Sequence, residues 1–142
     1  MSASPKKMVC ELSDGRGCGD EVRASALVSQ QGFGVRYDLD PASGVITNPD
    51  HDLFGEALQG RILVFTRPKG GVAASWSLAD LQQRGLAPAG IVFHVASPIF
   101  VQGALSAGLP IIDQLEGDPC ELIRSGDEVA LFPREGRLEV YR

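Results

Sequence analysis

The chain has no long apolar run, and this shortage bears first on where the protein can reside. Its longest apolar stretches, Ile62 to Phe65 and Ala89 to Phe93, are far shorter than the about 20 residues that a membrane-spanning helix needs. The N-terminal sequence MSASPKK lacks the apolar core of a signal peptide. We therefore expect a soluble, cytoplasmic protein that does not associate with membranes.

Positive charge is also scarce. The 142 residues include 13 lysines and arginines against 18 aspartates and glutamates, which gives a net charge of -5. Domains that bind nucleic acid usually carry a basic surface that attracts phosphates. The acidic balance therefore argues against DNA or RNA as a partner.

Cysteine and histidine are few, and their spacing fits no metal site. Cys10, Cys18 and Cys120 form no Cys-x-x-Cys motif and no Cys/His pair at ligand spacing. We expect no metal on this chain and three free or structural thiols. Because Cys10 and Cys18 lie in a segment rich in glycine and aspartate, Cys10 to Asp20, a mobile loop is expected there, where an exposed thiol can be oxidised.

Hydrophobic residues make up 44% of the chain, which is enough for one compact domain. We expect a mobile N-terminal segment at 1–22 and a single domain at 23–142. Strands are expected at 62–65, 90–96 and 109–113, separated by helices that end at Gly85 and Gly108, and this alternation produces parallel strands. Short apolar stretches at 26–28 and 33–37 suit a strand and a turn, residues 120–124 a helical turn, and 127–132 with 137–141 a hairpin. The predicted fold class is α/β, with a mixed, barrel-like sheet around a parallel βαβ core.

The segment Gly60 to Leu78, GRILVFTRPKGGVAASWSL, is typical of an anion site. A buried strand leads into a loop in which Gly70 and Gly71 let main-chain N–H groups approach a ligand, and a serine opens the helix that follows. Unpaired N–H groups and the positive end of the helix dipole meet at such a helix start. Arg67 and Lys69 add positive charge. We predict that these two cations and two glycines bind a carboxylate or phosphate of the substrate.

The order of the elements and four segments of the sequence together resemble the swivelling small subunit of the aconitase X family. The segments are NPDHDLFGEALQGRILVF, RPKGGVAASWSL, the Gly90-Ile91-Val92 strand and SGDEVALFP. The resemblance runs from Ala24 to Tyr141 and is most specific from Gly55-Glu56 to Lys69-Gly70. The family includes archaeal phosphomevalonate dehydratase small subunits and the small domain of cis-3-hydroxyproline dehydratases.

The resemblance implies a single swivelling β/β/α domain that closes over the active site of a larger aconitase X-type subunit in a heterodimer. The metal or iron-sulfur cluster is then expected in that larger subunit, and this chain supplies no ligand to it. The implied activity is that of a hydro-lyase, or dehydratase, acting on a small hydroxy acid. A metal acts on the departing hydroxyl, and a base removes the proton next to the carboxylate.

The family's loop carries the pattern Gly-Ser-x-x-Gly-Ser, and its first serine is the usual proton acceptor. In this chain that serine falls on Gly71, which has no group to accept a proton, and only the second serine is kept, as Ser75. The base is therefore Ser75, or lies on the larger subunit, or is absent. The alternative role for Ser75 is to cap the helix. The alternative function for the chain is a non-catalytic anion-binding or regulatory module, with Arg67 and Lys69 as solvated loop charges in the plainest case.

Three further residues have two interpretations each. His94, in the strand IVFHVAS, is expected to be a core histidine, although sites collect at the ends of buried parallel strands. His51 stands between Asp50 and Asp52 and is expected in an exposed turn rather than at a metal. Trp76 fits core packing and a partner interface equally well. Phosphohistidine carriers share a swivelling fold, but their glycine-threonine-serine-histidine surroundings are missing here.

Overall fold

The computed structural model describes residues 6–69 and 72–142. Its strands are Met8–Leu12 (β1), Arg16–Cys18 (β2), Val22–Val28 (β3), Leu39–Asp40 (β4), Val45–Ile46 (β5), Ile62–Phe65 (β6), Gly90–Phe93 (β7), Ile111–Asp113 (β8), Glu128–Phe132 (β9) and Arg137–Tyr141 (β10). The helices are Val35–Asp38 (α1), Val72–Gln83 (α2), Pro98–Ser106 (α3) and Pro119–Leu122 (α4), with a 3-10 turn at Pro133–Glu135 (η1).

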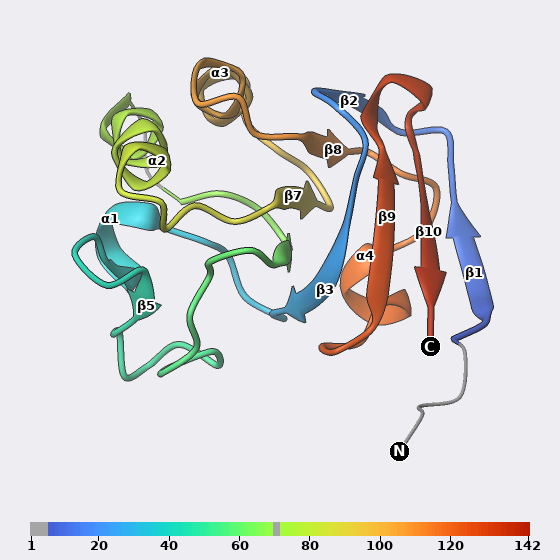
Figure 1. The fold of residues 1–142 in the computed structure, drawn as a ribbon, viewed down its shortest axis with the longest axis horizontal. Coiled ribbons are helices and arrows are strands. Elements are labelled where there is room, and N and C mark those ends of the chain that lie inside the picture. Colours follow the sequence, from blue (N-terminus) through green and yellow to red (C-terminus); the bar gives the residue numbers. More distant parts are fainter. Residues whose placement is uncertain (1–5, 70–71) are drawn as a thin grey trace.

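A mixed eight-stranded sheet organises these elements in the order β1-β10-β9-β3-β6-β7-β8-β2. The strands β3, β6, β7 and β8 are parallel, and the others pair antiparallel. Helices α2 and α3 lie side by side over one face of the parallel strands, and α4 lies away from them on the other side (Figure 1). The predicted α/β class with a parallel βαβ core is confirmed, and β9 and β10 form the predicted hairpin.

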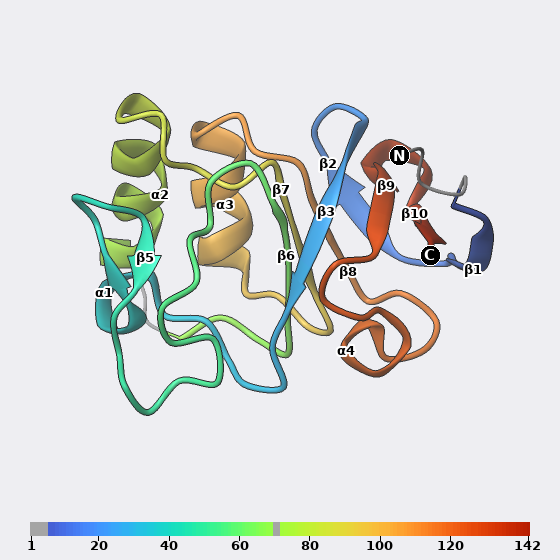
Figure 2. The ribbon, with the colours of Figure 1, turned by 60° about the horizontal axis from the view of Figure 1, so that its bottom comes forward.

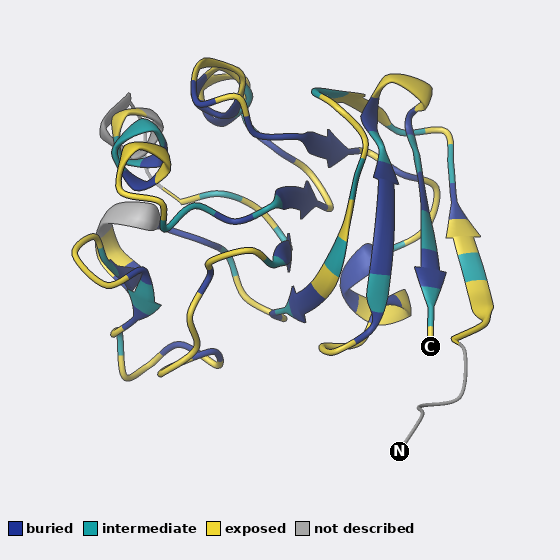
Figure 3. Cartoon of the chain, in the orientation of Figure 1, coloured by how far each residue is buried: buried dark blue, intermediate teal, exposed yellow. Residues whose placement is uncertain are grey.

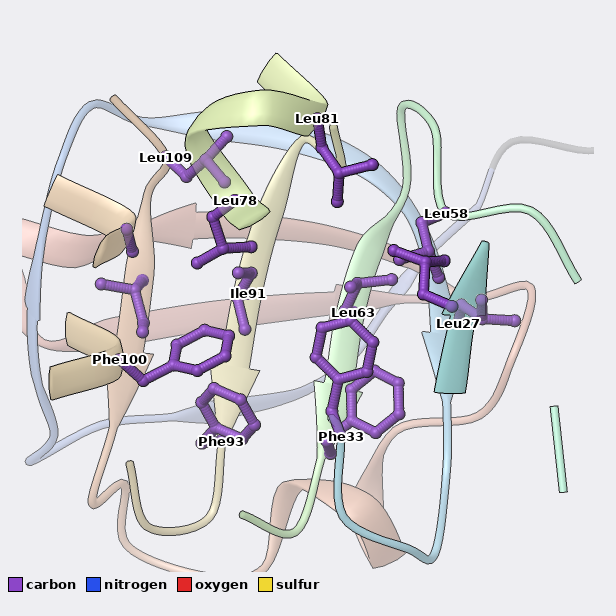
Figure 4. Packing of buried hydrophobic residues seen from close by; sticks show 14 of the residues in the cluster. Leu27, Phe33, Leu58, Leu63, Leu78, Leu81, Ile91, Phe93, Phe100 and Leu109 are labelled. Atoms are coloured by element: carbon purple, nitrogen blue, oxygen red, sulfur yellow. The ribbon is translucent and has the colours of Figure 1, made fainter. Parts of the chain in front are cut away.

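The central parallel strands β6 and β7 are buried on both faces, as the burial colours of Figure 3 show, and this explains their continuous apolar sequences. In β6, Leu63 and Phe65 join the cluster under the helices, whereas Ile62 and Val64 join a second cluster inside the barrel-like part. Figure 4 shows the first cluster, where strand residues meet helix residues; the labelled side chains include Leu63, Ile91, Phe93, Leu78, Leu81 and Phe100.

The sheet curls towards a barrel because β1 and β2, at opposite ends of the strand order, are consecutive in the chain. Between them the Gly15 N–H donates to Gly136 O at 3.0 Å, which brings this connection against η1. Figure 2 shows β1, β2, β9 and β10 gathered at one end of the molecule. The predicted barrel-like character is therefore confirmed.

The segment Cys10 to Asp20 is not the irregular loop that its composition suggested. It contains the end of β1 and the whole of β2, which pairs with β8. Gly17 lies so close to β8 that an added Cβ would stand 2.5 Å from Ile111 O. Glycine is therefore needed here for close packing, and not for flexibility. The domain boundary at residue 23 and the mobility of residues 1–22 stay predictions.

Two helix ends match the expectations closely. Gly85 has φ +73°, and Leu86 N–H donates to Leu81 O at 2.9 Å, so the chain leaves α2 through the left-handed residue that glycine supplies. At the start of α3, Ser97 Oγ accepts from the Phe100 N–H at 3.2 Å, and Pro98 occupies the first turn. These ends fix where each helix meets the edge of the sheet.

Candidate functional site

The loop after β6 is held in place by main-chain hydrogen bonds to residue 33. The Phe33 N–H donates to Arg67 O at 2.9 Å, and the Lys69 N–H donates to Phe33 O at 2.7 Å. An isolated parallel bridge between Phe33 and Pro68 has the same geometry. These main-chain contacts with Phe33 therefore hold the loop in position as far as Lys69. Gly70 and Gly71 lie outside the described residues, so their predicted role stays a prediction.

The Lys69 side chain pairs with a buried carboxylate of its own chain. Lys69 Nζ lies 3.2 Å from Asp38 Oδ2, and the Asp38 side chain is 0% exposed. The same carboxylate accepts from the Gly34 N–H at 2.9 Å and from Asn48 Nδ2 at 2.8 Å. The Lys69 ammonium, which we predicted would bind the substrate, is therefore already paired with a carboxylate of its own chain.

Burial alone would raise the pKa of the Asp38 carboxyl, because it removes the charged form from water. Hydrogen bonds from Asn48 and Gly34 and the nearby Lys69 ammonium outweigh that effect and hold the pKa below its usual value. Asp38 is therefore a charged, fully satisfied anchor beneath the loop. No local pattern in the sequence marks Asp38 for this role, because its partners Lys69 and Asn48 lie elsewhere in the chain.

Arg67 is exposed at the same edge of the sheet. Within residues 6–69 and 72–142 its guanidinium takes part in no ion pair, whereas the Lys69 ammonium does. Arg67 is therefore the more available of the two predicted cations for a carboxylate or phosphate. Its main-chain carbonyl is meanwhile fixed by Phe33, so the loop can present this side chain from a stable backbone.

Ser75 does not open a helix, contrary to the expectation. Helix α2 begins at Val72, so Ser75 is its fourth residue, too far into the helix for an N-cap. The interpretation of Ser75 as the capping residue is therefore wrong. Its role as a proton acceptor is a separate question and stays a prediction.

The burial of the two histidines is the reverse of what the sequence indicated. His51, expected in an exposed turn, is 3% exposed. Its Nδ1 accepts from the Leu53 N–H at 3.1 Å, and its Nε2 lies 3.1 Å from Gly32 O, so both ring nitrogens are engaged. Neighbouring Asp52 accepts from Ser29 Oγ at 2.6 Å. His51 is therefore a buried residue with a structural role in the segment 38–53.

His94, expected in the core, has a side chain that is 48% exposed. The strand β7 ends at Phe93, so His94 is the first residue beyond the buried run, at the carboxyl end of a parallel strand. Its Nδ1 lies 3.8 Å from Asp118 Oδ1. An accessible imidazole with a carboxylate beside it thus stands at the edge where ligands bind in parallel sheets.

Cys10 lies in β1, Cys18 in β2 and Cys120 in α4. Burial raises the pKa of Cys10 and Cys18, and it raises the pKa of Cys120 to about 12, with Asp118 as a further cause. Such thiols are poor nucleophiles, since the thiolate is the reactive form. Among the residues that the structure describes, no group of three or more His, Cys, Asp or Glu side chains is placed to hold a metal ion.

An apolar groove of about 580 Å³ lies between α2 and α3. It is lined by Trp76, Ala79, Pro98, Ile99, Gln102, Gly103 and Ser106. Trp76 is 74% exposed, so it does not pack in the core. Large exposed aromatic side chains of this kind are enriched at the centres of protein interfaces. Within the described ranges no helix is long and apolar enough to span a membrane.

Comparison with known proteins supports one family. Residues 12–140 match the family model of the aconitase X swivel domain. A phosphomevalonate dehydratase small subunit from Methanopyrus kandleri is 39% identical over 121 residues, which cover 85% of this chain and 89% of the relative. Another, from Methanocella arvoryzae, is 32% identical over 130 residues, covering 92% of this chain and 98% of the relative.

The fold agrees with the sequence match. The crystal structure of Thermococcus kodakaraensis aconitase X in its holo-form superposes with a TM-score of 0.86 at 26% identity, covering 92% of this chain and 98% of that chain. Sequence and fold therefore agree over nearly the whole length of the chain. The chain belongs to the aconitase X swivel-domain family.

Proposed function

We propose that this chain is the small subunit of an aconitase X-type hydro-lyase that dehydrates a small hydroxy acid. The observation that carries the proposal is the match of residues 12–140 to the aconitase X swivel domain. Relatives that cover nearly the same length are named phosphomevalonate dehydratase small subunits. Phosphomevalonate is accordingly the first substrate to test, followed by other hydroxy acids.

The loop between β6 and α2 would bind the anionic group of the substrate. Arg67 is exposed there and lacks an ion pair within the described residues, so it can approach a carboxylate or phosphate. Lys69 is fixed by Asp38 and contributes local positive charge rather than a free clamp. Gly70 and Gly71 would offer main-chain N–H groups close to the start of α2.

The partner would be a larger aconitase X-type subunit, over which this domain closes. The groove between α2 and α3 supports this assignment because Trp76, which lines it, directly follows Ser75 in the chain. A subunit that covered this apolar surface would also exclude water from the neighbouring edge of the sheet, which strengthens charged interactions there.

A metal or iron-sulfur cluster would belong to that larger subunit. The described cysteines do not fit a cluster on this chain, since they are spread over β1, β2 and α4 and no group of ligands forms around them. Such a centre would supply Lewis-acid chemistry at the departing hydroxyl. The contribution of the chain itself is to bind the anion and to take part in proton transfer.

The serine that accepts the proton in the family falls on Gly71 here, so Ser75, the second family serine, is one candidate to accept the proton next to the carboxylate. Its place in the first turns of α2 supports this role only in part, because the positive end of a helix dipole favours an anion nearby. Ser75→Ala in the assembled enzyme tests it. A catalytic serine predicts a loss of turnover by orders of magnitude with normal assembly.

Co-expression with the larger subunit tests the function. We expect the two chains to purify together and to convert a hydroxy acid into its unsaturated acid, followed by the vinylic proton signals in NMR spectra. Assembly and ligand binding without turnover on any hydroxy acid would instead support the non-catalytic binding module. Absence of both assembly and activity would contradict the proposal.

A further inference from the structure

We propose that His94 is the group on this chain that accepts the proton from the substrate, and that Asp118 orients its ring. The proposal rests on the dehydratase function proposed above. It departs from the Ser75 hypothesis, and it follows from the position of an exposed imidazole that the sequence had suggested would be buried. His94 would be a catalytic residue, and Asp118 a positioning residue.

His94 stands next to the anion loop. Strands β6 and β7 run parallel with Phe65 paired to Phe93, and the pairing continues beyond their ends. The His94 N–H donates to Phe65 O at 3.1 Å, and the Val95 N–H donates to Thr66 O at 3.2 Å. His94 is therefore level with Thr66, one residue before Arg67. The main chains of His94 and Arg67 therefore reach the same edge of the sheet, and the proposal places the substrate acid between their side chains.

The carboxyl end of β8 fixes the other side of His94. The Gln114 N–H donates to His94 O at 3.1 Å, so the main chain of His94 is held between β6 and β8. Asp118 is itself held, because its Oδ1 accepts from the Cys120 N–H at 2.9 Å at the start of α4. The Asp118 carboxylate, 3.8 Å from Nδ1, faces this nitrogen and favours the ring orientation that leaves Nε2 outward.

Two other groups that could accept a proton near this edge, Asp113 and His51, are already engaged. Asp113 is 3% exposed, accepts from the Ala96 N–H and pairs with Arg16. Both nitrogens of His51 are engaged in the core. Of the two histidines, only His94 exposes its ring, and imidazole is the side chain whose ordinary pKa lies nearest to neutral pH.

The step balances without any further reactant. His94 Nε2 takes the proton from the carbon next to the carboxylate, and the electron pair of that C–H bond forms the carbon–carbon double bond. The bond between the neighbouring carbon and its hydroxyl breaks, and the hydroxyl leaves as hydroxide. Hydroxide takes a proton from solvent to become water, and the imidazolium returns its proton to solvent.

The test uses the complex with the larger subunit. His94→Asn removes the acceptor but keeps a polar side chain, and general-base catalysis is worth about 10² to 10⁴ in rate, so we expect kcat to fall by at least about 100-fold. Exchange of the substrate proton with deuterium from the solvent should be lost as well, with assembly unchanged. Glu116→Gln, on the exposed connection after β8, is the matched control and should retain full activity.

Asp118→Asn separates positioning from folding. The amide oxygen can still accept from the Cys120 N–H, so we expect stability and KM to stay unchanged. We expect kcat to fall by about 10-fold, because the neutral amide attracts Nδ1 less and the ring loses its orientation. A fall in stability with unchanged kcat would show a merely structural role and overturn the assignment of Asp118.

The outcomes distinguish this inference from the proposed function. An active complex that loses turnover in Ser75→Ala but not in His94→Asn overturns the inference and leaves the dehydratase function standing. An assembled wild-type complex that dehydrates no hydroxy acid overturns both. Loss of kcat and of proton exchange in His94→Asn, with normal assembly, supports the inference.

Discussion

The buried carboxylate of Asp38 and the half-exposed ammonium of Lys69 lie 3.2 Å apart and connect α1 to the loop before α2. This ion pair gives the loop a second attachment besides its main-chain bonds to Phe33. It also distinguishes the two cations that we predicted would bind the substrate. Lys69 is paired within the fold, whereas Arg67 takes part in no ion pair among the described residues.

Asp38→Asn should destabilise the chain because the variant loses the charged acceptor while its side chain remains buried. Hydrogen bonds to charged groups contribute about 1.5 to 3 kcal/mol, and we expect a loss in that range in the free energy of unfolding, measured with urea. Asp50→Asn, an exposed position in the same segment, is the control and should change stability little. Equal stability of the two variants would contradict the anchoring role of Asp38.

Acid should weaken the fold through the same carboxylate. Burial tends to raise the pKa of Asp38, but its hydrogen bonds and Lys69 bring it below the usual value. The carboxylate therefore stabilises the fold above the unfolded-state pKa of about 3.9, and this stabilisation is lost as pH falls through the lowered folded value. Asp127, beside Arg142, has the same balance of causes and the same sign.

Urea unfolding between neutral pH and about pH 3 measures this dependence, and the free energy of unfolding should fall mainly in the acid part of the range. Asp38→Asn should show a shallower fall than the wild-type chain. If the two curves fall in parallel, Asp38 does not contribute to the acid sensitivity.

Arg67→Ala should weaken substrate binding without affecting the fold. Loss of one charge-assisted contact of about 1.5 kcal/mol corresponds to an increase in KM of about 10-fold in the assembled enzyme. Arg84→Ala, which removes an exposed arginine at the other end of α2, is the control. An unchanged KM in Arg67→Ala would place the anion elsewhere.

Trp76→Ala should weaken assembly with the larger subunit by at least about 10-fold in Kd, because interface tryptophans often contribute 2 kcal/mol or more. The stability of the isolated chain should not change, since Trp76 is 74% exposed. Leu122→Ala, an exposed apolar residue on α4, is the control. Because Trp76 is the only tryptophan, its emission should shift to shorter wavelength when the wild-type chains assemble.

Much of the fold could be predicted because the middle of the chain has a clear alternation. Buried strands such as Ile62–Phe65 are apolar on both faces, and Gly85 and Ser97 mark helix ends by well-understood backbone chemistry. The strands β1 and β2 were harder to predict from the sequence. Gly17 reads as a loop residue in isolation, and only the distance to Ile111 O shows that packing against β8 requires it.

The candidate site was predictable to a smaller extent. The segment around Arg67 and Lys69 gave a local signal, but the partner of Lys69 is Asp38, which is distant in sequence. The exposure of His94 depends on where β7 ends, and that is set by its neighbours. Contacts that bring distant segments together leave no local pattern, so the sequence placed both histidines wrongly.

A titration of the two subunits shows whether this chain completes a dehydratase. A fixed amount of the larger aconitase X-type subunit is mixed with increasing amounts of this chain, and the rate of formation of the unsaturated acid is measured. We expect almost no activity without the chain and a rate that rises to a plateau when the two are equimolar. A rate that is independent of the chain, or no dehydration at any ratio, would contradict it.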